Sequence, residues 1–136
     1  MSLASEFQDR GAGKLPGHLG IEVLEVEPGR TVMRLPIRTA LLAPNGYLHA
    51  ASVVGLADTA AGYGCAASLP EGAAGFTTIE LKSNFLGTLT EGALRTEATL
   101  IHGGRSTQIW DAPVIDEATG KVLALFRCTQ MVRWPR

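Results

Sequence analysis

The sequence carries little charge and no excess of either sign. Its 136 residues include 12 Lys and Arg against 13 Asp and Glu, a formal net charge of −1 at pH 7. Without a basic excess, nucleic acid is a poor candidate partner. Charged residues make up only 18% of the chain and hydrophobic residues 46%. A surface so poor in charge favours burial against further copies, so we expect a homo-oligomer.

Cysteine is also scarce, and a long uninterrupted apolar run is missing. Cys65 and Cys128 are too few for a disulfide scaffold, and neither has a second ligand at metal-site spacing. We therefore predict two core thiols and no metal site. Residues 1–13 include acidic side chains and no signal-like apolar run, and no segment reaches membrane-spanning length without turn residues. The expectation is a soluble, cytoplasmic protein with no membrane contact.

Length and turn residues predict one domain with a short leader. Residues 1–18 form the leader, in which Ser2 to Arg10 is a helix capped by Ser2 or Ser5, broken by the glycines and proline of 11–17. Residues 19–136 form the domain. Alternating apolar residues bounded by turn formers predict six strands, at residues 19–27, 30–37, 76–85, 93–101, 106–115 and 122–132.

Residues 50–67 predict a long buried helix, because nearly all of them are small or apolar. Gly55, Gly62 and Gly64 lower its helix propensity, but they let another backbone approach closely, as a wrapped sheet requires. Two strands, one buried helix and four antiparallel strands give an α+β domain with the helix against one face of a curled sheet.

Asp58 stands out as the single carboxylate of this helix. Removing a carboxylate from water is costly unless it is paired or hydrogen-bonded. One interpretation is structural: Asp58 faces a water-filled space and forms hydrogen bonds with neighbouring hydroxyls such as that of Thr59. The other is functional: a carboxylate in a partly apolar cleft acts as a general base or nucleophile.

The start of the helix is the second candidate feature. Free N–H groups and the helix dipole favour developing negative charge there, as in an oxyanion hole. The amide of Ala50 would polarise an ester or thioester carbonyl, and Asp58 follows a little over two turns later. His49 is equally compatible with a cap and with a catalytic role.

Together these residues resemble the hotdog-fold acyl-CoA thioesterases, and most closely the phenylacetate-degradation (PaaI-like) branch. The resemblance extends from about residue 19 to residue 132. The segments that carry it are Asn45-Gly46-x-x-His49-Ala50-Ala51, Leu56-Ala57-Asp58-Thr59-Ala60, Thr77-Thr78-Ile79-Glu80-Leu81-x-x-Asn84-Phe85 and Gly104-Arg105.

The resemblance implies a central helix wrapped by a curved antiparallel sheet, in homodimers joined edge to edge or homotetramers of two dimers. The active site would lie at the dimer interface. Asp58 takes the position of the catalytic carboxylate and Ala50 that of the oxyanion donor. Thr78 matches a hydroxyl residue that the partner subunit contributes to hold water. A strand threonine chosen for β-propensity is the alternative for Thr78.

The sequence departs from this family at two places. Where the family usually has His-Gly-Gly, this sequence has His49-Ala50-Ala51. Alanine still supplies the backbone N–H of the oxyanion donor, but its methyl group narrows the groove through which the thioester approaches. Ala43 stands where the family commonly has Asn or Gln, and Asn45 lies two residues later.

The predicted function is hydrolysis of a small acyl-CoA, with aryl groups among the candidates, to the free acid and CoA without a cofactor. A non-catalytic acyl-CoA binding or sensing protein is the alternative, motivated by the alanines, and a hotdog dehydratase is a weaker third. Family analogy places coenzyme A along the strand of Lys82 to Phe85 and the turn at residues 103–106. Lys82 and Arg105 are the candidate phosphate contacts, and both are equally compatible with plain surface charges. The proposed CoA contacts are Lys82, Asn84, Phe85, Gly104, Arg105 and Ser106.

Overall fold

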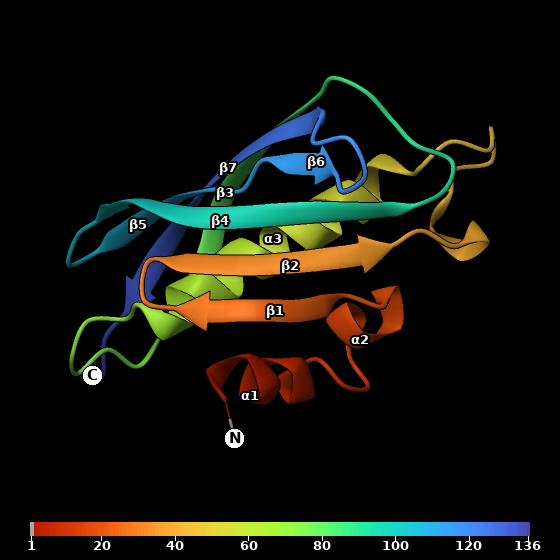
Figure 1. Ribbon diagram of the computed structural model, residues 1–136. Helices are drawn as coiled ribbons and strands as arrows, with labels where there is room; N and C mark the ends of the chain where they lie inside the picture. The colour runs from red at the N-terminus through yellow and green to blue at the C-terminus, as the bar shows by residue number, and fades with distance from the viewer. Residues whose placement is uncertain (1) are drawn as a thin grey trace.

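One long helix lies against a single curved antiparallel sheet in the computed structural model, which describes residues 2–136 (Figure 1). The helices are α1 (Leu3–Arg10), α2 (Leu15–Leu19) and α3 (Ala50–Ala67), with a 3-10 turn at Thr39–Leu41. The strands are β1 (Glu22–Glu27), β2 (Arg30–Pro36), β3 (Gly75–Phe85), β4 (Ala93–Gly103), β5 (Thr107–Asp111), β6 (Val114–Asp116) and β7 (Val122–Arg133). The α+β prediction is confirmed, and α3 has its predicted bounds.

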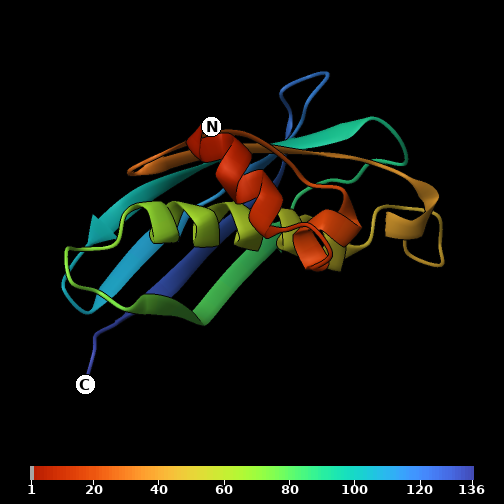
Figure 2. The ribbon, with the colours of Figure 1, turned by 90° about the horizontal axis from the view of Figure 1, so that it is seen from below.

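The sheet runs β1-β2-β4-β5-β7-β3, and β6 also pairs with β4 and β7. Figure 2, seen from below, shows the sheet curving over α3. Strand β1 therefore lies at one edge and β3 at the other. The core between helix and sheet is built from fully buried side chains such as Leu56, Leu94 and Trp110.

The single strand predicted over residues 106–115 is wrong, because it is split into β5 and β6. The break falls at Ala112 and Pro113. Proline has no N–H to give to a central ladder. The chain still stays on the sheet, because Ala112 donates its N–H to the carbonyl of Phe126 and the Pro113 carbonyl accepts from Thr96 Oγ1. β5 and β6 thus occupy successive stretches of the space between β4 and β7.

The glycines of α3 face side chains, which corrects the expectation of a close backbone. A Cβ at Gly64 would lie 2.5 Å from ring atoms of Trp110, and one at Gly55 would lie 2.7 Å from Leu19. At Gly62 the nearest atom is 3.5 Å away, on Phe76. Gly64 in particular makes room for the largest buried side chain of the core.

The N-terminal residues pack against β1 and α3. Ser2 caps α1 by accepting the N–H of Ser5. Phe7 is buried and contacts Tyr63 of α3, with the ring centroids 5.0 Å apart. The segment predicted as a break contains the short helix α2, because Pro16 is tolerated in a first helical turn.

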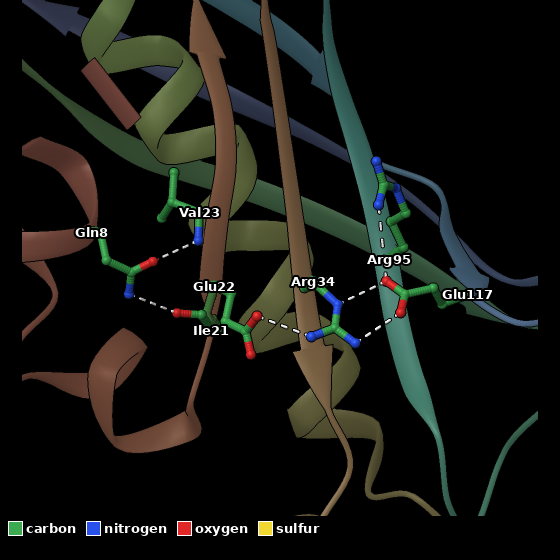
Figure 3. Close-up of polar contacts among 7 residues, drawn as sticks. All are labelled: Gln8, Ile21, Glu22, Val23, Arg34, Arg95 and Glu117. Atoms are coloured by element: carbon green, nitrogen blue, oxygen red, sulfur yellow. Dashed lines mark hydrogen bonds and ion pairs between the residues drawn. The ribbon is translucent and has the colours of Figure 1, made fainter. Parts of the chain in front are cut away.

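Gln8 joins this segment to the sheet edge. Its amide donates to the carbonyl of Ile21 and accepts the N–H of Val23, as Figure 3 shows. The same figure shows Arg34 between Glu22 and Glu117 on the outer face of the sheet. The guanidinium of Arg34 lowers the pKa of Glu117.

Candidate active site

The loop before α3 is held firmly, so the start of the helix has a fixed position. The N–H of His49 and the hydroxyl of Ser52 both donate to the carbonyl of Leu41, at 3.1 and 2.9 Å. The N–H of Leu48 donates to the carbonyl of Leu89 at 3.0 Å. These bonds fix the first turn of α3 against two other parts of the chain.

His49 is the N-cap of α3, and its cap bond selects a ring tautomer. Its Nδ1 accepts the N–H of Ala51 at 2.9 Å. A neutral imidazole that accepts at Nδ1 carries its proton on Nε2, which is left to act as a donor. The structural alternative for His49 is therefore observed, and it is compatible with a second role through Nε2.

The amide of Ala50 is the free donor at this helix end. Its neighbours' N–H groups are engaged, since Ala51 donates to His49 Nδ1 and Ser52 donates to the His49 carbonyl. Within residues 2–136, the Ala50 N–H has no protein acceptor. Ala50 is also exposed. An exposed N–H on the first helical residue is well placed to bind an oxyanion.

Asn45 is engaged in a local turn through its side chain. Its Oδ1 accepts the N–H of Tyr47 at 3.1 Å, and Gly46 has a positive φ of 89°. The Ala43 N–H donates to the Tyr47 carbonyl and closes the turn. Asn45 thus shapes the loop that leads to His49.

Asp58 is half-buried in α3 and lacks a partner on one oxygen. Among the described residues, its Oδ1 is one of two buried side-chain atoms without a hydrogen bond, the other being Ser83 Oγ. Burial raises the pKa of the Asp58 carboxyl. The hydrogen bond to Thr59 that a structural role would provide is not formed. A buried carboxylate oxygen left unsatisfied is costly, so it points to a functional constraint.

Both cysteines are buried as free, protonated thiols. Burial raises the pKa of Cys65 and of Cys128 to about 12, and the charge of Asp58 adds to the effect at Cys128. A thiol with such a pKa is a poor nucleophile at neutral pH. Across residues 2–136, no three His, Cys, Asp or Glu side chains are grouped so that they could hold a metal ion.

Thr78 lies on the inner face of β3, where it contacts Gln130 of β7. Gln130 was not among the residues predicted for the site. The Thr78 hydroxyl donates to Oε1 of Gln130 at 2.7 Å, and Gln130 Nε2 contacts Cys128 Sγ at 3.5 Å. Cys128 thus links Asp58 and Gln130 within one subunit, since it contacts Gln130 and the charge of Asp58 helps to raise its pKa. The pairing of β3 with β7 brings Thr78 and Gln130 together, and no local motif announces it.

Ala50 and Asp58 are too far apart to act on one ester within a subunit. They are eight residues apart on a regular helix, which is about 12 Å along the axis at about 1.5 Å per residue. A carbonyl oxygen on the Ala50 amide has its carbon within about 1.5 Å of that oxygen. Asp58 of the same chain cannot contact that carbon.

The residues expected to bind CoA fall into separate groups. Lys82 and Asn84 share the outer face of β3, whereas Phe85 lies on the opposite face. The other three residues form the turn between β4 and β5, where Arg105 stacks on Trp134 at 4.3 Å. On β7, the ladder partner of Lys82 and that of Thr107, which follows the turn, are four residues apart, or about 14 Å.

A depression of about 580 Å³ opens on the sheet face away from α3. Lys82 and Asn84 line it, together with an ion pair between Asp111 and Arg127. Its remaining lining residues are Glu97, Thr99, Pro113, Leu125 and Phe126. Two of the six expected CoA contacts therefore lie on this concave surface.

None of the helices in residues 2–136 has the length and apolar character needed to cross a membrane.

Known proteins share both the sequence and the fold. The pattern of the thioesterase superfamily matches residues 45–123. The 1,4-dihydroxy-2-naphthoyl-CoA hydrolase of Listeria monocytogenes is 37% identical over 118 residues, covering 87% of this chain and 94% of that protein. The hydrolase of the same name from Escherichia coli is 26% identical over 125 residues, covering 90% and 88%. A mutant thioesterase from Pseudomonas aeruginosa has the same fold, with a TM-score of 0.89 at 23% identity over 96% of this chain and 93% of that one.

The chain therefore belongs to the thioesterase superfamily, with the hotdog fold that the resemblance implied. It is a thioester hydrolase, of the acyl-CoA thioesterase class. The predicted enzyme class is thus confirmed over the binding or sensing alternative.

Proposed function

We propose that this enzyme hydrolyses small aryl-CoA thioesters, with Asp58 as the general base. The observation that carries the proposal is the unpartnered, half-buried oxygen of Asp58. The aryl preference is supported by the relatives named as 1,4-dihydroxy-2-naphthoyl-CoA hydrolases. The finer placement in the phenylacetate-degradation branch stays a prediction.

Exposed apolar side chains on β3 support an aromatic acyl group. Leu81 and Phe85 share the inner face with Thr78, and both are more than two-fifths exposed. An acyl pocket beside the general base would need such apolar walls. A flat aromatic ring buries large apolar area there at little entropic cost.

The proposed active unit is a homodimer joined through β3. This strand is an 11-residue edge with no partner on its outer side in the subunit. Ile79 and Leu86 are exposed along or just beyond it. A long apolar edge is the type of surface that pairs with a second copy. A homotetramer of two such dimers stays a prediction.

In a two-fold dimer, Ala50 of one subunit and Asp58 of the other would together form one complete site. Pairing of the β3 edges about a two-fold axis places the two α3 helices antiparallel. The start of one helix then approaches Asp58 of the other. We assign the oxyanion donor to Ala50 of the partner subunit, and the general base and water ligand to Asp58 and Thr78 of one chain. This proposal differs from the arrangement that the resemblance implies, in which Thr78 acts across the interface.

The same pairing brings together the two groups expected to bind CoA. Lys82 lies toward the end of β3, and the turn containing Arg105 lies beside its start. In an antiparallel β3 pair, the end of one strand lies beside the start of the other. The partner's Lys82 would therefore approach the turn containing Arg105, where the two cations suit the phosphates of CoA.

The proposed reaction balances as a simple hydrolysis. Asp58 takes one proton from a water molecule as the water oxygen attacks the thioester carbon. The Ala50 amide of the partner subunit stabilises the oxyanion of the tetrahedral intermediate. The C–S bond then breaks, and the thiolate of CoA takes up the proton that Asp58 received. The products are the free acid and CoA thiol.

The test is a thiol-release assay over short aliphatic, long aliphatic and aryl-CoA thioesters, with Asp58→Asn as a variant. We expect the highest kcat/KM with the aryl esters and a loss of about 100-fold or more in kcat for the variant. Equal rates across the panel would overturn the aryl preference. Full turnover by Asp58→Asn would remove Asp58 from the mechanism.

A further inference from the structure

Two fully buried glutamines face each other on the inner side of the sheet. Gln108 of β5 and Gln130 of β7 are ladder partners, and their side chains are 2% and 0% exposed. Burying an amide is costly unless its hydrogen bonds are satisfied. Gln108 is held by the indole N–H of Trp110 and by the carbonyl of Ser68. Gln108 thus has a structural role that accounts for it.

Gln130 has a different partner, because it binds the hydroxyl of Thr78. The hydroxyl donates its proton to Gln130 Oε1 at 2.7 Å. Gln130 Nε2 donates to Cys128 Sγ, which fixes which end of the amide faces Thr78. The side chain of Gln130 is therefore oriented from both ends.

The bond to Gln130 limits what Thr78 can do toward a substrate or a water. A hydroxyl has one proton to donate and two lone pairs that accept. Since the proton of Thr78 is used by Gln130, only the lone pairs remain. Thr78 can then accept a hydrogen bond from a water molecule, and it has no proton of its own left to donate to the carboxylate of Asp58.

We propose that Gln130 is a positioning residue that makes Thr78 a pure hydrogen-bond acceptor toward the attacking water. This inference rests on the proposed function. One proton of the water points to Thr78 and the other to Asp58, which leaves an oxygen lone pair directed at the thioester carbon. The water keeps the proton that faces Thr78 when it becomes the hydroxyl of the product acid.

The experiment compares Gln130→Met with Gln108→Met in the thiol-release assay, using an aryl-CoA. Both variants remove a buried amide of the same layer, so both should lower Tm by a similar amount. We expect Gln130→Met to lower kcat about tenfold, the value of one lost hydrogen bond, with KM unchanged. Gln108→Met should keep kcat within about twofold. Equal losses of kcat in both variants would overturn the proposal.

The dependence on Thr78 gives a second readout. In a Thr78→Val background, Gln130→Met should cause no further loss of kcat, because the hydroxyl that it orients is gone. Gln130→Glu keeps an acceptor oxygen of the same reach and should retain kcat within about threefold. A loss as large as that of Thr78→Val would overturn the role of Gln130 even where Gln130→Met does not fold.

Two variants separate the role of Thr78 in the proposed function from the positioning role of Gln130. If Thr78→Val leaves kcat unchanged, the assignment of Thr78 in the proposed function is wrong, and the role of Gln130 falls with it. If Thr78→Val lowers kcat while Gln130→Met does not, the proposed function stands and the positioning role is wrong.

Discussion

At the scale of single residues, Asp58 combines a proposed role in the reaction with a cost to the stability of the folded chain. Its carboxyl is half-buried with one oxygen unsatisfied, and burial raises its pKa. Folding therefore favours the protonated form of Asp58 over the ionised form. A general base, however, must be ionised to act. The residue that serves the reaction is thus expected to lower the stability of the free enzyme at neutral pH.

This conflict predicts a pH-dependent gain in stability for Asp58→Asn. Because the folded-state pKa lies above the unfolded value, the favourable contribution of Asp58 is complete below the unfolded pKa. It is lost as pH rises through the folded pKa. The neutral amide avoids that loss, so the Tm of the variant should exceed that of wild type at about pH 8, with the gap closing toward about pH 4. Melting curves across this range measure it, and a gap independent of pH would contradict it.

Sequence alone identified Asp58, because a lone carboxylate in an apolar helix is visible as a pattern. Gln130 had no such signal. Its partner Thr78 is 52 residues away, and the contact depends on the register between β3 and β7. A glutamine within a strand looks like any polar strand residue until the opposing side chain is known. Candidate residues could therefore be recognised only where the local sequence made them unusual.

At the scale of elements, the bounds of α3 were predictable and the reason for its glycines was not. The expectation of a close backbone followed from glycine's size, but the space at Gly64 is filled by a tryptophan from β5. Similarly, alternation predicted one strand over residues 106–115, whereas Pro113 interrupts the ladder. Periodicity indicates which segments form strands or helices, and it says little about which side chain fills a given space.

The contacts of these glycines predict opposite effects of two similar substitutions. Gly64→Ala places a methyl 2.5 Å from the buried Trp110 ring, so it should destabilise the fold by about 1–3 kcal/mol. Gly62→Ala is the matched control, since its methyl meets Phe76 at 3.5 Å, an ordinary contact. That variant should be neutral or up to about 1 kcal/mol more stable through helix propensity. Chemical denaturation measures both, and equal effects would contradict this view of the core.

At the scale of the whole molecule, the proposed division of the site between two subunits predicts complementation. Ala50→Pro deletes the proposed oxyanion donor, and proline is tolerated at the first helical position after an extended residue such as His49. Homodimers of Ala50→Pro and of Asp58→Asn should both be nearly inactive. A mixed dimer contains one intact site, so a 1:1 mixture should recover about a quarter of wild-type activity after subunit exchange.

The mixing experiment has a clear opposite outcome. If each site took Ala50 and Asp58 from the same chain, every subunit of the mixture would carry one defect and no activity would return. Subunit exchange is verified independently by mass spectrometry of differently tagged chains.

Gln8 binds the edge of the sheet opposite to β3, where β1 lies. By taking the N–H of Val23 and giving its own to the Ile21 carbonyl, it satisfies edge groups that a neighbouring strand would otherwise bind. In the sheet described over residues 2–136, the start of the β1 edge is thus bound by a side chain of α1, whereas β3 has no partner on its outer side. A molecule with two open ends could stack without limit into a filament. By engaging groups at the start of β1, Gln8 makes this edge a poorer site for a further strand than β3.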